Sequence, residues 1–157
     1  MKMETGIKVQ DVMTRHPVTV NVTITVEEAA KLMGEKEVGS LLVLDKHGEL
    51  FGIVTEQDIV RKVVAKGLEP SMSIKAAVEQ RIFTIEPHED IFEAMSFMGK
   101  QNIRHLPVLN NSKLVGFVTI KDILKIHPQL VDLIVDRMEL KEQDKKLASM
   151  SGEELEL

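Results

Sequence analysis

The chain contains no cysteine, no tryptophan and no tyrosine, and only 3% of its 157 residues are aromatic. The lack of cysteine excludes a disulfide framework and a thiolate metal site. The scarcity of aromatic residues argues against a single-stranded nucleic-acid binder, which needs rings for base stacking. No leading apolar segment has the length of a signal peptide or a membrane span. We therefore expect a soluble, cytoplasmic protein with no membrane association.

Charge is unevenly distributed along the chain. Net charge is −5 at pH 7, and residues 128–157 alone carry eight acidic and four basic side chains. The other 127 residues are nearly neutral, with 17 acidic and 16 basic side chains. A protein that binds duplex nucleic acid normally shows a basic face, so nucleic acid is not expected as a partner. The hydrophobic share of 43% is ample for one domain-sized core.

An internal repeat is the most informative feature that is present, because residues 18–59 recur at 83–123. The copies are 65 residues apart at first, and a one-residue deletion then makes the offset 64. Self-similarity at a fixed period indicates repeated supersecondary units. Two copies are too few for a solenoid and predict a pseudo-two-fold pair. Identical positions include Thr19/Thr84, Glu28/Glu93, Ala29/Ala94, Met33/Met98, Leu41/Leu106, Gly52/Gly116, Thr55/Thr119 and Asp58/Asp122.

Each copy is predicted to fold in the order β-α-β-β-α. Short β-prone runs at 18–22 and 82–85 open the copies, and helices follow from near Thr25 and near His88. Two strands joined by a tight turn come next, and a closing helix ends each copy. Helical spacing predicts buried side chains at Ala29, Leu32, Met33, Ile91, Ala94, Met95 and Met98.

The sequence after His127 departs from the repeat. From Lys141 onward it is mostly charged and is expected to fray or project. Before that, helical spacing predicts one more helix that docks through Leu130, Leu133, Ile134 and Met138.

Both copies contain the segment Gly-h-h-Thr-x-x-Asp, where h is apolar, at residues 52–58 and 116–122. Each segment is a predicted buried strand that leads into the closing helix. Thr-x-x-Asp before an apolar run is typical of a helix capping box. The same carboxylate, beside a helix N-terminus that favours anions, is also suited to accept hydrogen bonds from the vicinal hydroxyls of a ribose. The residues alone leave both interpretations open.

The repeated unit and its motif resemble a tandem pair of CBS domains, a Bateman module, of the kind that stands alone in prokaryotes, archaea included. The resemblance covers about residues 9–126. It implies an α/β (α+β) protein with one motif at 9–66, a second at 73–127 and a helical, acidic tail at 128–157. CBS pairs sense adenosine nucleotides and regulate other proteins, so the resemblance implies a sensor that is not an enzyme.

The resemblance also implies two ligand sites, each combining the Asp of one motif with the first strand of the other. In the family the Asp holds the ribose, the Thr lies near the ribose and phosphate, early-strand residues contact adenine, and basic residues reach the phosphate. The first predicted site consists of Thr14, Val18, Thr19, Val38, Gly39, Arg104, His105, Phe117, Thr119 and Asp122. The second consists of Ile53, Thr55, Asp58, Phe83, Thr84 and Ile103.

The second site is expected to be the weaker one. Glu79 stands there at the position of Thr14, and neutral Gly39 and Ser40 stand at the positions of the basic pair that follows Ile103. An acid and two neutral residues make a poorer phosphate site than Arg and His. A salt-bridging surface role remains open for that basic pair, because exposed charges usually contribute little.

The expected ligand is AMP, ADP or ATP, and no further cofactor and no metal are expected. The five histidines show no metal-ligand spacing, and there is no nucleophile–base pair, Walker loop or dinucleotide fingerprint. The resemblance also implies a homodimer and an unidentified protein partner. S-adenosylmethionine as the ligand, a ligand-free interaction module and a nucleic-acid-linked transcriptional regulator remain alternatives.

Overall fold

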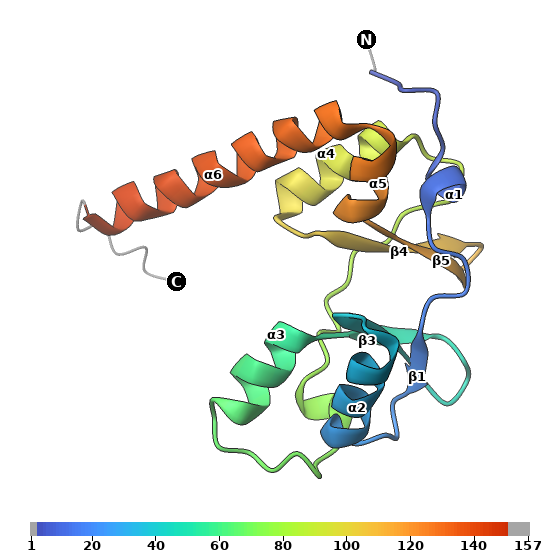
Figure 1. Cartoon of the computed structure of the whole chain (residues 1–157), viewed down its shortest axis with the longest axis vertical. Coiled ribbons are helices and arrows are strands. Elements are labelled where there is room, and N and C mark those ends of the chain that lie inside the picture. Colours follow the sequence, from blue (N-terminus) through green and yellow to red (C-terminus); the bar gives the residue numbers. More distant parts are fainter. Residues whose placement is uncertain (1–2, 151–157) are drawn as a thin grey trace. The chain divides into compact units, whose positions relative to one another are not determined.

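The computed structural model describes residues 3–150 and contains two compact units. Unit 1 comprises Met1–Thr14, Ile85–Val108 and Phe117–Leu157, and unit 2 comprises Arg15–Thr84 and Leu109–Gly116. These units do not coincide with the two sequence repeats. The beginning of the chain belongs with the second repeat, and the segment that joins the repeats belongs with the first (Figure 1).

Unit 2 is built on a three-stranded sheet in the order β1-β2-β3. β1 runs parallel to β2, and β2 runs antiparallel to β3. The fully or nearly buried side chains of the sheet, among them Leu41, Val43 and Val54, form one core with α2. The elements are β1 (Thr19–Asn21), α2 (Val26–Lys36), β2 (Ser40–Leu44), β3 (Leu50–Thr55), α3 (Glu56–Ile59), the π-helix η1 (Val60–Val64) and the 3-10 helix η2 (Ile74–Ala76).

Unit 1 carries the equivalent helices and most of a two-stranded sheet, β4-β5, whose hairpin tip at 109–116 is counted with unit 2. The long helix α6 packs against α4 and α5 (Figure 1). The predicted mixed α/β architecture is therefore confirmed. The elements are α1 (Val9–Val12), α4 (Ile91–Gln101), β4 (His105–Asn110), β5 (Lys113–Thr119), α5 (Ile120–Ile126) and α6 (Pro128–Met150).

Short leading segments at 7–14 and 72–79 complete the units by pairing with the other repeat. In unit 1, Val9 N–H donates to Glu89 O over 2.9 Å. In unit 2, the equivalent Ile74 N–H donates to Ile24 O over 3.0 Å. The side chains of Val9 and Ile74 are both fully buried. Each leading segment therefore supplies core contacts to the repeat that it does not precede.

The predicted strand at 82–85 is wrong. It is reduced to a single parallel bridge between Ile85 and Val108, whereas the first repeat forms the three-residue strand β1. The physical reason lies in the neighbouring strand. Leu42 N of β2 donates to the carbonyl oxygen of Val18, the residue before β1, over 3.2 Å. The equivalent residue of β4 is Pro107, which has no N–H to donate, so that ladder bond does not form.

The helix starts are confirmed in the first repeat and corrected in the second. Thr25 caps α2, as expected, and forms a capping box with Glu28. α4 begins at Ile91 rather than near His88, because the Asp90 side chain caps the helix there. The predicted helix faces are buried as expected, with Leu32 only partly so. The buried residues are Ala29, Met33, Ile91, Ala94, Met95 and Met98.

The backbone of α6 is helical through Met150, so the fraying predicted from Lys141 onward is not observed over residues 141–150, and residues 151–157 lie outside the described part of the chain. Leu130 is buried at the start of the helix, in agreement with the predicted docking. No helix within residues 3–150 has both the length and the apolar character needed to cross a bilayer. Three other side chains predicted to dock lie outside the described residues: Leu133, Ile134 and Met138.

A C-cap comparison between the repeats gives a stability prediction. Glu37 and Asn102 end α2 and α4 at equivalent positions, with left-handed φ values of 55° and 54°. This conformation costs an ordinary L-residue about 1–2 kcal/mol, but Asn adopts it more readily. We expect Glu37→Asn to stabilise the protein by about 0.5–1 kcal/mol and the reciprocal Asn102→Glu to destabilise it. Thermal unfolding checks this, and shifts of the same sign for both variants contradict it.

A carboxylate clamp on the N-terminal segment gives a pH prediction. Asp90 accepts hydrogen bonds from Thr5 N and Gly6 N, each 2.9 Å, from Thr5 Oγ1 at 2.9 Å, and from Phe92 N at 2.8 Å. Burial raises the pKa of Asp90, but these hydrogen bonds outweigh it and hold the pKa below its ordinary value. The stabilisation is therefore fully present above the unfolded-state pKa of about 3.9 and is lost as pH falls through the lower folded-state pKa.

Asp90→Asn should destabilise the protein at pH 7 by on the order of 1 kcal/mol, because hydrogen bonds to an ionised acceptor are stronger than those to a neutral amide, and the difference from the unsubstituted chain should disappear at strongly acidic pH. Urea unfolding at a series of pH values measures it. Asp132→Asn, at an exposed position of α6, is the control for removing one charge. A deficit for Asp90→Asn that persists unchanged at pH 2.5 would contradict the role of the ionised carboxylate.

Candidate functional site

The two Thr-x-x-Asp motifs both form capping boxes. In α5, Thr119 N donates to Asp122 Oδ2 over 2.9 Å, and Asp122 N donates to Thr119 Oγ1 over 3.3 Å. In α3, the equivalent distances between Thr55 and Asp58 are 2.9 and 3.1 Å. The capping interpretation of the sequence is therefore confirmed. Each box uses one carboxylate oxygen, Oδ2. The partner of the second oxygen, Oδ1, depends on the residues around the motif.

The second oxygen differs between the two motifs. Asp58 Oδ1 lies 3.1 Å from Lys62 Nζ, one helical turn further along. Asp122 Oδ1 makes no hydrogen bond or ion pair within the described part of the chain. The residue at the position of Lys62 is the exposed Ile126, which offers no partner. The carboxylate of Asp122 is thus held in place by its cap and still has one acceptor oxygen available.

Unit 1 gathers six of the ten residues predicted for the first site. Thr14 and Phe117 exchange two backbone hydrogen bonds, of 2.8 and 3.0 Å. Arg104 O accepts from Ile120 N over 3.0 Å, which fixes Arg104 beside the start of α5. The ring of His105 lies 5.6 Å from that of Phe117, with an interplanar angle of 37°. Thr14, Arg104, His105 and Phe117 therefore adjoin the Thr119–Asp122 capping box.

Unit 2 contains the other four residues predicted for the first site. Thr19 begins β1 and pairs with Leu42 of β2. Gly39 immediately precedes β2, and its carbonyl accepts from Glu56 N over 3.0 Å. The four residues are Val18, Thr19, Val38 and Gly39. Of the six residues predicted for the second site, Ile103 lies in unit 1, and those in unit 2 are Ile53, Thr55, Asp58, Phe83 and Thr84.

The environment of the motif in unit 2 is acidic where that in unit 1 is not. Ile53 pairs with Glu79 through hydrogen bonds of 3.0 and 2.8 Å, which is the equivalent of the Phe117 and Thr14 pair. Glu56 Oε2 would lie 3.4 Å from a Cβ added at Gly39, the position that is Arg104 in unit 1. Two glutamates therefore occupy the neighbourhood in which unit 1 presents a threonine and an arginine.

Gly52 makes the pairing of Glu79 possible. A Cβ at Gly52 would lie 2.4 Å from Val78 Cγ1 and 2.5 Å from Glu79 O, both far below contact distance. The backbone of the second leading segment consequently runs against β3 only because residue 52 has no side chain. In unit 2, the glycine of the repeated motif is thus explained by close approach of the backbone.

Two features were missed in the sequence. Lys62 follows Asp58 at the i, i+4 spacing of helical ion pairs, which is a recognisable signal. Glu86, His88 and Glu89 place potential metal-ligand atoms within 4.8 Å of one another, although His88 Nε2 already lies 3.2 Å from Glu86 Oε2. Glu86 and His88 are exposed and nothing else nearby points to an ion, so the absence of a metal stays a prediction.

Known proteins match this chain in sequence and in structure, and two of the sequence relatives are as follows. An uncharacterised protein of Methanopyrus kandleri is 36% identical over 135 residues, which is 85% of this chain and 69% of that protein. The CBS domain-containing protein YhcV of Bacillus subtilis is 30% identical over 115 residues, which is 73% of this chain and 81% of that protein.

Solved structures show the same fold. An uncharacterised conserved protein from Pyrococcus horikoshii superposes with a TM-score of 0.72 at 29% identity, covering 80% of this chain and 93% of the other. The CBS domain pair of the protein MJ0100, solved in complex with 5′-methylthioadenosine and S-adenosyl-L-methionine, gives 0.70 at 27% identity, covering 78% and 97%.

The family model of the CBS domain matches the chain twice, at residues 9–65 and 74–128, which together make up most of its length. Both matches include a Thr-x-x-Asp capping box and the strand hairpin before it. The chain belongs to the CBS domain family and contains a pair of these domains.

Proposed function

We propose that this CBS pair is a cytoplasmic, non-catalytic regulatory module that binds an adenosine nucleotide, AMP, ADP or ATP, and signals its occupancy to a partner protein. The single observation that carries the proposal is the carboxylate of Asp122, fixed by its capping box with one acceptor oxygen available. Support from outside the chain comes from MJ0100, whose CBS pair was solved with two adenosine derivatives.

Asp122 is suited to hold a ribose. A carboxylate accepts hydrogen bonds from vicinal hydroxyls, and the cap already fixes its orientation through Thr119 N. A ligand therefore meets an acceptor that is already ordered, and the Asp122 side chain loses little conformational freedom when the ligand binds. In this proposal Thr119 lies near the ribose and phosphate, and Thr14 and Phe117 line the base side.

Arg104 and His105 are suited to hold a phosphate. Arg104 is exposed, and its backbone is tied to the first residue of α5. Its guanidinium group is permanently charged and recognises phosphate oxygens through paired donors. His105 is half-buried at the start of β4, next to the ring of Phe117. A nucleotide that carries a phosphate is accordingly favoured over a nucleoside in unit 1.

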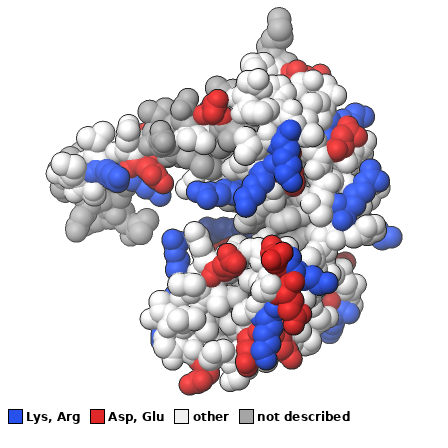
Figure 2. Space-filling view, viewed as in Figure 1, with Lys and Arg blue, Asp and Glu red and all other residues white. Residues whose placement is uncertain are grey.

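S-adenosylmethionine or methylthioadenosine is the alternative ligand, because the CBS pair of MJ0100 was solved with both. Either would use Asp122 for the ribose but would not need Arg104. Nucleic acid is a weaker alternative. Acidic and basic side chains are interspersed along α2 (Figure 2), including the pair Glu27 and Lys31 at 3.5 Å, and a duplex binder would instead present a basic stripe.

Signalling in this proposal passes from α5 to α6. Asp122 lies in the first turn of α5, and α6 follows α5 after a single residue and packs against it. A ligand that favours one arrangement of α5 therefore changes the population of α6 arrangements. Coupling to a partner at α6 would satisfy the requirement of allostery for a second site.

We also propose a homodimer, formed through the closing helices. Val60 and Leu124 occupy equivalent positions of the two repeats and are 56% and 44% exposed. Val64 and Ile126, on the same helices, are also exposed. Apolar side chains repeated at the same place in both copies are best satisfied by a second copy of the same surface.

Loss of the Asp122 carboxylate should remove most nucleotide binding. Asp122→Asn should weaken AMP at least tenfold, because a hydrogen bond to a charged group contributes about 1.5–3 kcal/mol. Asp58→Asn should cost little, because Lys62 already engages Asp58. Titration calorimetry measures both, with ligand-free thermal unfolding as the control for lost caps. Equal losses for the two variants, or no binding of any adenosine derivative by the unsubstituted chain, would contradict the proposal.

Arg104→Ala should separate phosphate recognition from recognition of the nucleoside. AMP affinity should fall tenfold or more, because a charge-assisted contact to phosphate is lost, while adenosine affinity should be nearly unchanged. Lys36→Ala, at the exposed end of α2 in unit 2, is the matched control for net charge. If AMP and adenosine weaken by the same factor, Arg104 shapes the site without contacting phosphate.

A further inference from the structure

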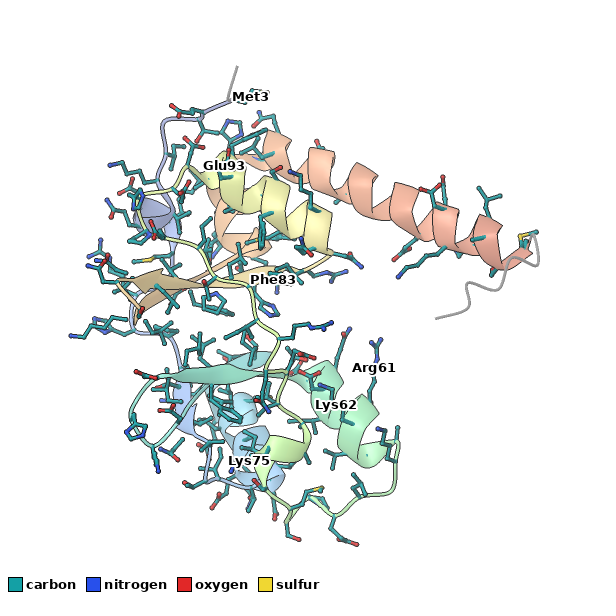
Figure 3. All side chains as sticks on the ribbon, turned by 180° about the vertical axis from the view of Figure 1, so that it is seen from behind. Met3, Arg61, Lys62, Lys75, Phe83 and Glu93 are labelled. Carbon is teal, nitrogen blue, oxygen red and sulfur yellow. The ribbon has the colours of Figure 1, made fainter. Side chains whose placement is uncertain are left out.

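Lys62 contacts three acceptors in unit 2, and all of them belong to the neighbourhood of the Asp58 motif. Its Nζ lies 3.1 Å from Asp58 Oδ1 and 3.8 Å from Glu79 Oε2, and it donates to Ala77 O over 3.4 Å. The Lys62 and Asp58 side chains are only 33% and 19% exposed. Figure 3 shows Lys62 on the helix formed by α3 and η1.

This arrangement engages both carboxylate oxygens of Asp58. Oδ2 accepts from both Thr55 N and Thr55 Oγ1 over 2.9 Å, and Oδ1 faces the Lys62 ammonium group. A ribose hydroxyl would therefore have to displace or share an ammonium group, exchanging an ion pair between two charged groups for a hydrogen bond in which only the acceptor is charged. The equivalent carboxylate in unit 1, that of Asp122, meets no such competitor, because Ile126 stands at the position of Lys62.

Lys62 also lies in a helical feature that the second repeat lacks. Lys62 lies in the π-helical turn η1, in which Ala65 N donates to Val60 O over 2.8 Å. The second repeat remains α-helical up to Ile126. Single π-turns are rare and occur frequently at functional sites. Two of the three acceptors, Ala77 and Glu79, come from the leading segment, so Lys62 ties that segment to the motif.

We propose that Lys62 is an internal competitor that masks the Asp58 motif against a nucleoside, so that the chain has one open site and one masked site. This inference rests on the proposed function, in which the motif carboxylate holds ribose. The masked motif takes a nucleoside without a phosphate. Glu79 and Glu56 adjoin it, and no basic side chain stands where Arg104 stands in unit 1. Two carboxylates repel a phosphate but not an uncharged adenosine.

The test measures adenosine binding to the full chain by titration calorimetry. Asp122→Asn first removes the open site, and Lys62→Met is then added to unmask the other. The double variant should bind adenosine at least fivefold more tightly than Asp122→Asn alone, with no comparable gain for AMP. Adding Asp58→Asn should abolish the gain. Lys62→Arg in the same background should retain the mask. Lys62→Gln serves as a second unmasking variant if Lys62→Met is poorly folded.

Lys31→Met is the matched control, because it removes the other i, i+4 partner in unit 2, which lies 3.5 Å from Glu27 on α2. It should leave adenosine binding unchanged. If the unsubstituted chain binds adenosine but neither Lys62→Met nor Lys62→Gln adds affinity, the mask is wrong and the proposed function stands. If no variant binds any adenosine derivative, both are overturned. A gain of equal size from Lys31→Met would show a general charge effect and would also overturn the mask.

Discussion

Two backbone pairings organise this molecule: Thr14 with Phe117 in unit 1, and Glu79 with Ile53 in unit 2. Each joins a leading segment to the strand that carries the motif of the other repeat. The pairing in unit 2 needs Gly52, because any side chain there would collide with Val78 and with the backbone of Glu79. Because these pairings decide which residues adjoin each Thr-x-x-Asp motif, the chemistry of each unit depends on them.

The capping box and the proposed ligand site are two uses of the same carboxylate. One oxygen of Asp122 completes the helix start, which fixes the side chain without any ligand, and the other is left for a hydroxyl. Structural and functional interpretations of the motif therefore do not compete. In unit 2 the same cap is kept, but Lys62 occupies the second oxygen of Asp58. A duplicated scaffold has in this way produced two electrostatically different environments.

Divergence between the copies follows from few substitutions. Pro107 removes one ladder bond and with it the strand that the first repeat forms. Lys62 against Ile126, and Glu79 against Thr14, change the charge beside the motif without changing the backbone pairing. The fold tolerates the changes at residues 62 and 79 because these side chains lie outside the apolar cores of the two units, in which the equivalent Leu41 and Leu106 are both buried.

The repeat, the buried helix faces, the caps and, apart from one strand, the element order could be predicted from the amino-acid sequence. These depend on local spacing, and residues such as Thr55 and Asp58 meet within one turn whatever the rest of the chain does. The resemblance to CBS pairs predicted Arg104 and His105 as the basic pair beside one motif. The strand predicted at 82–85 failed because the donor that it needed was missing from a neighbouring strand, at Pro107.

Which leading segment completes which unit could not be predicted from the sequence and is known from the folded chain. That choice rests on backbone hydrogen bonds between residues distant in the chain, such as Val9 with Glu89 and Ile53 with Glu79, and backbone groups carry no sequence signal of their partner. The i, i+4 spacing of Lys62 from Asp58 is a local signal of the state of the second carboxylate oxygen. The motif itself does not determine that state, since both copies read Thr-x-x-Asp. That state was settled by whether a cation one helical turn away reaches that oxygen, as Lys62 does and Ile126 cannot.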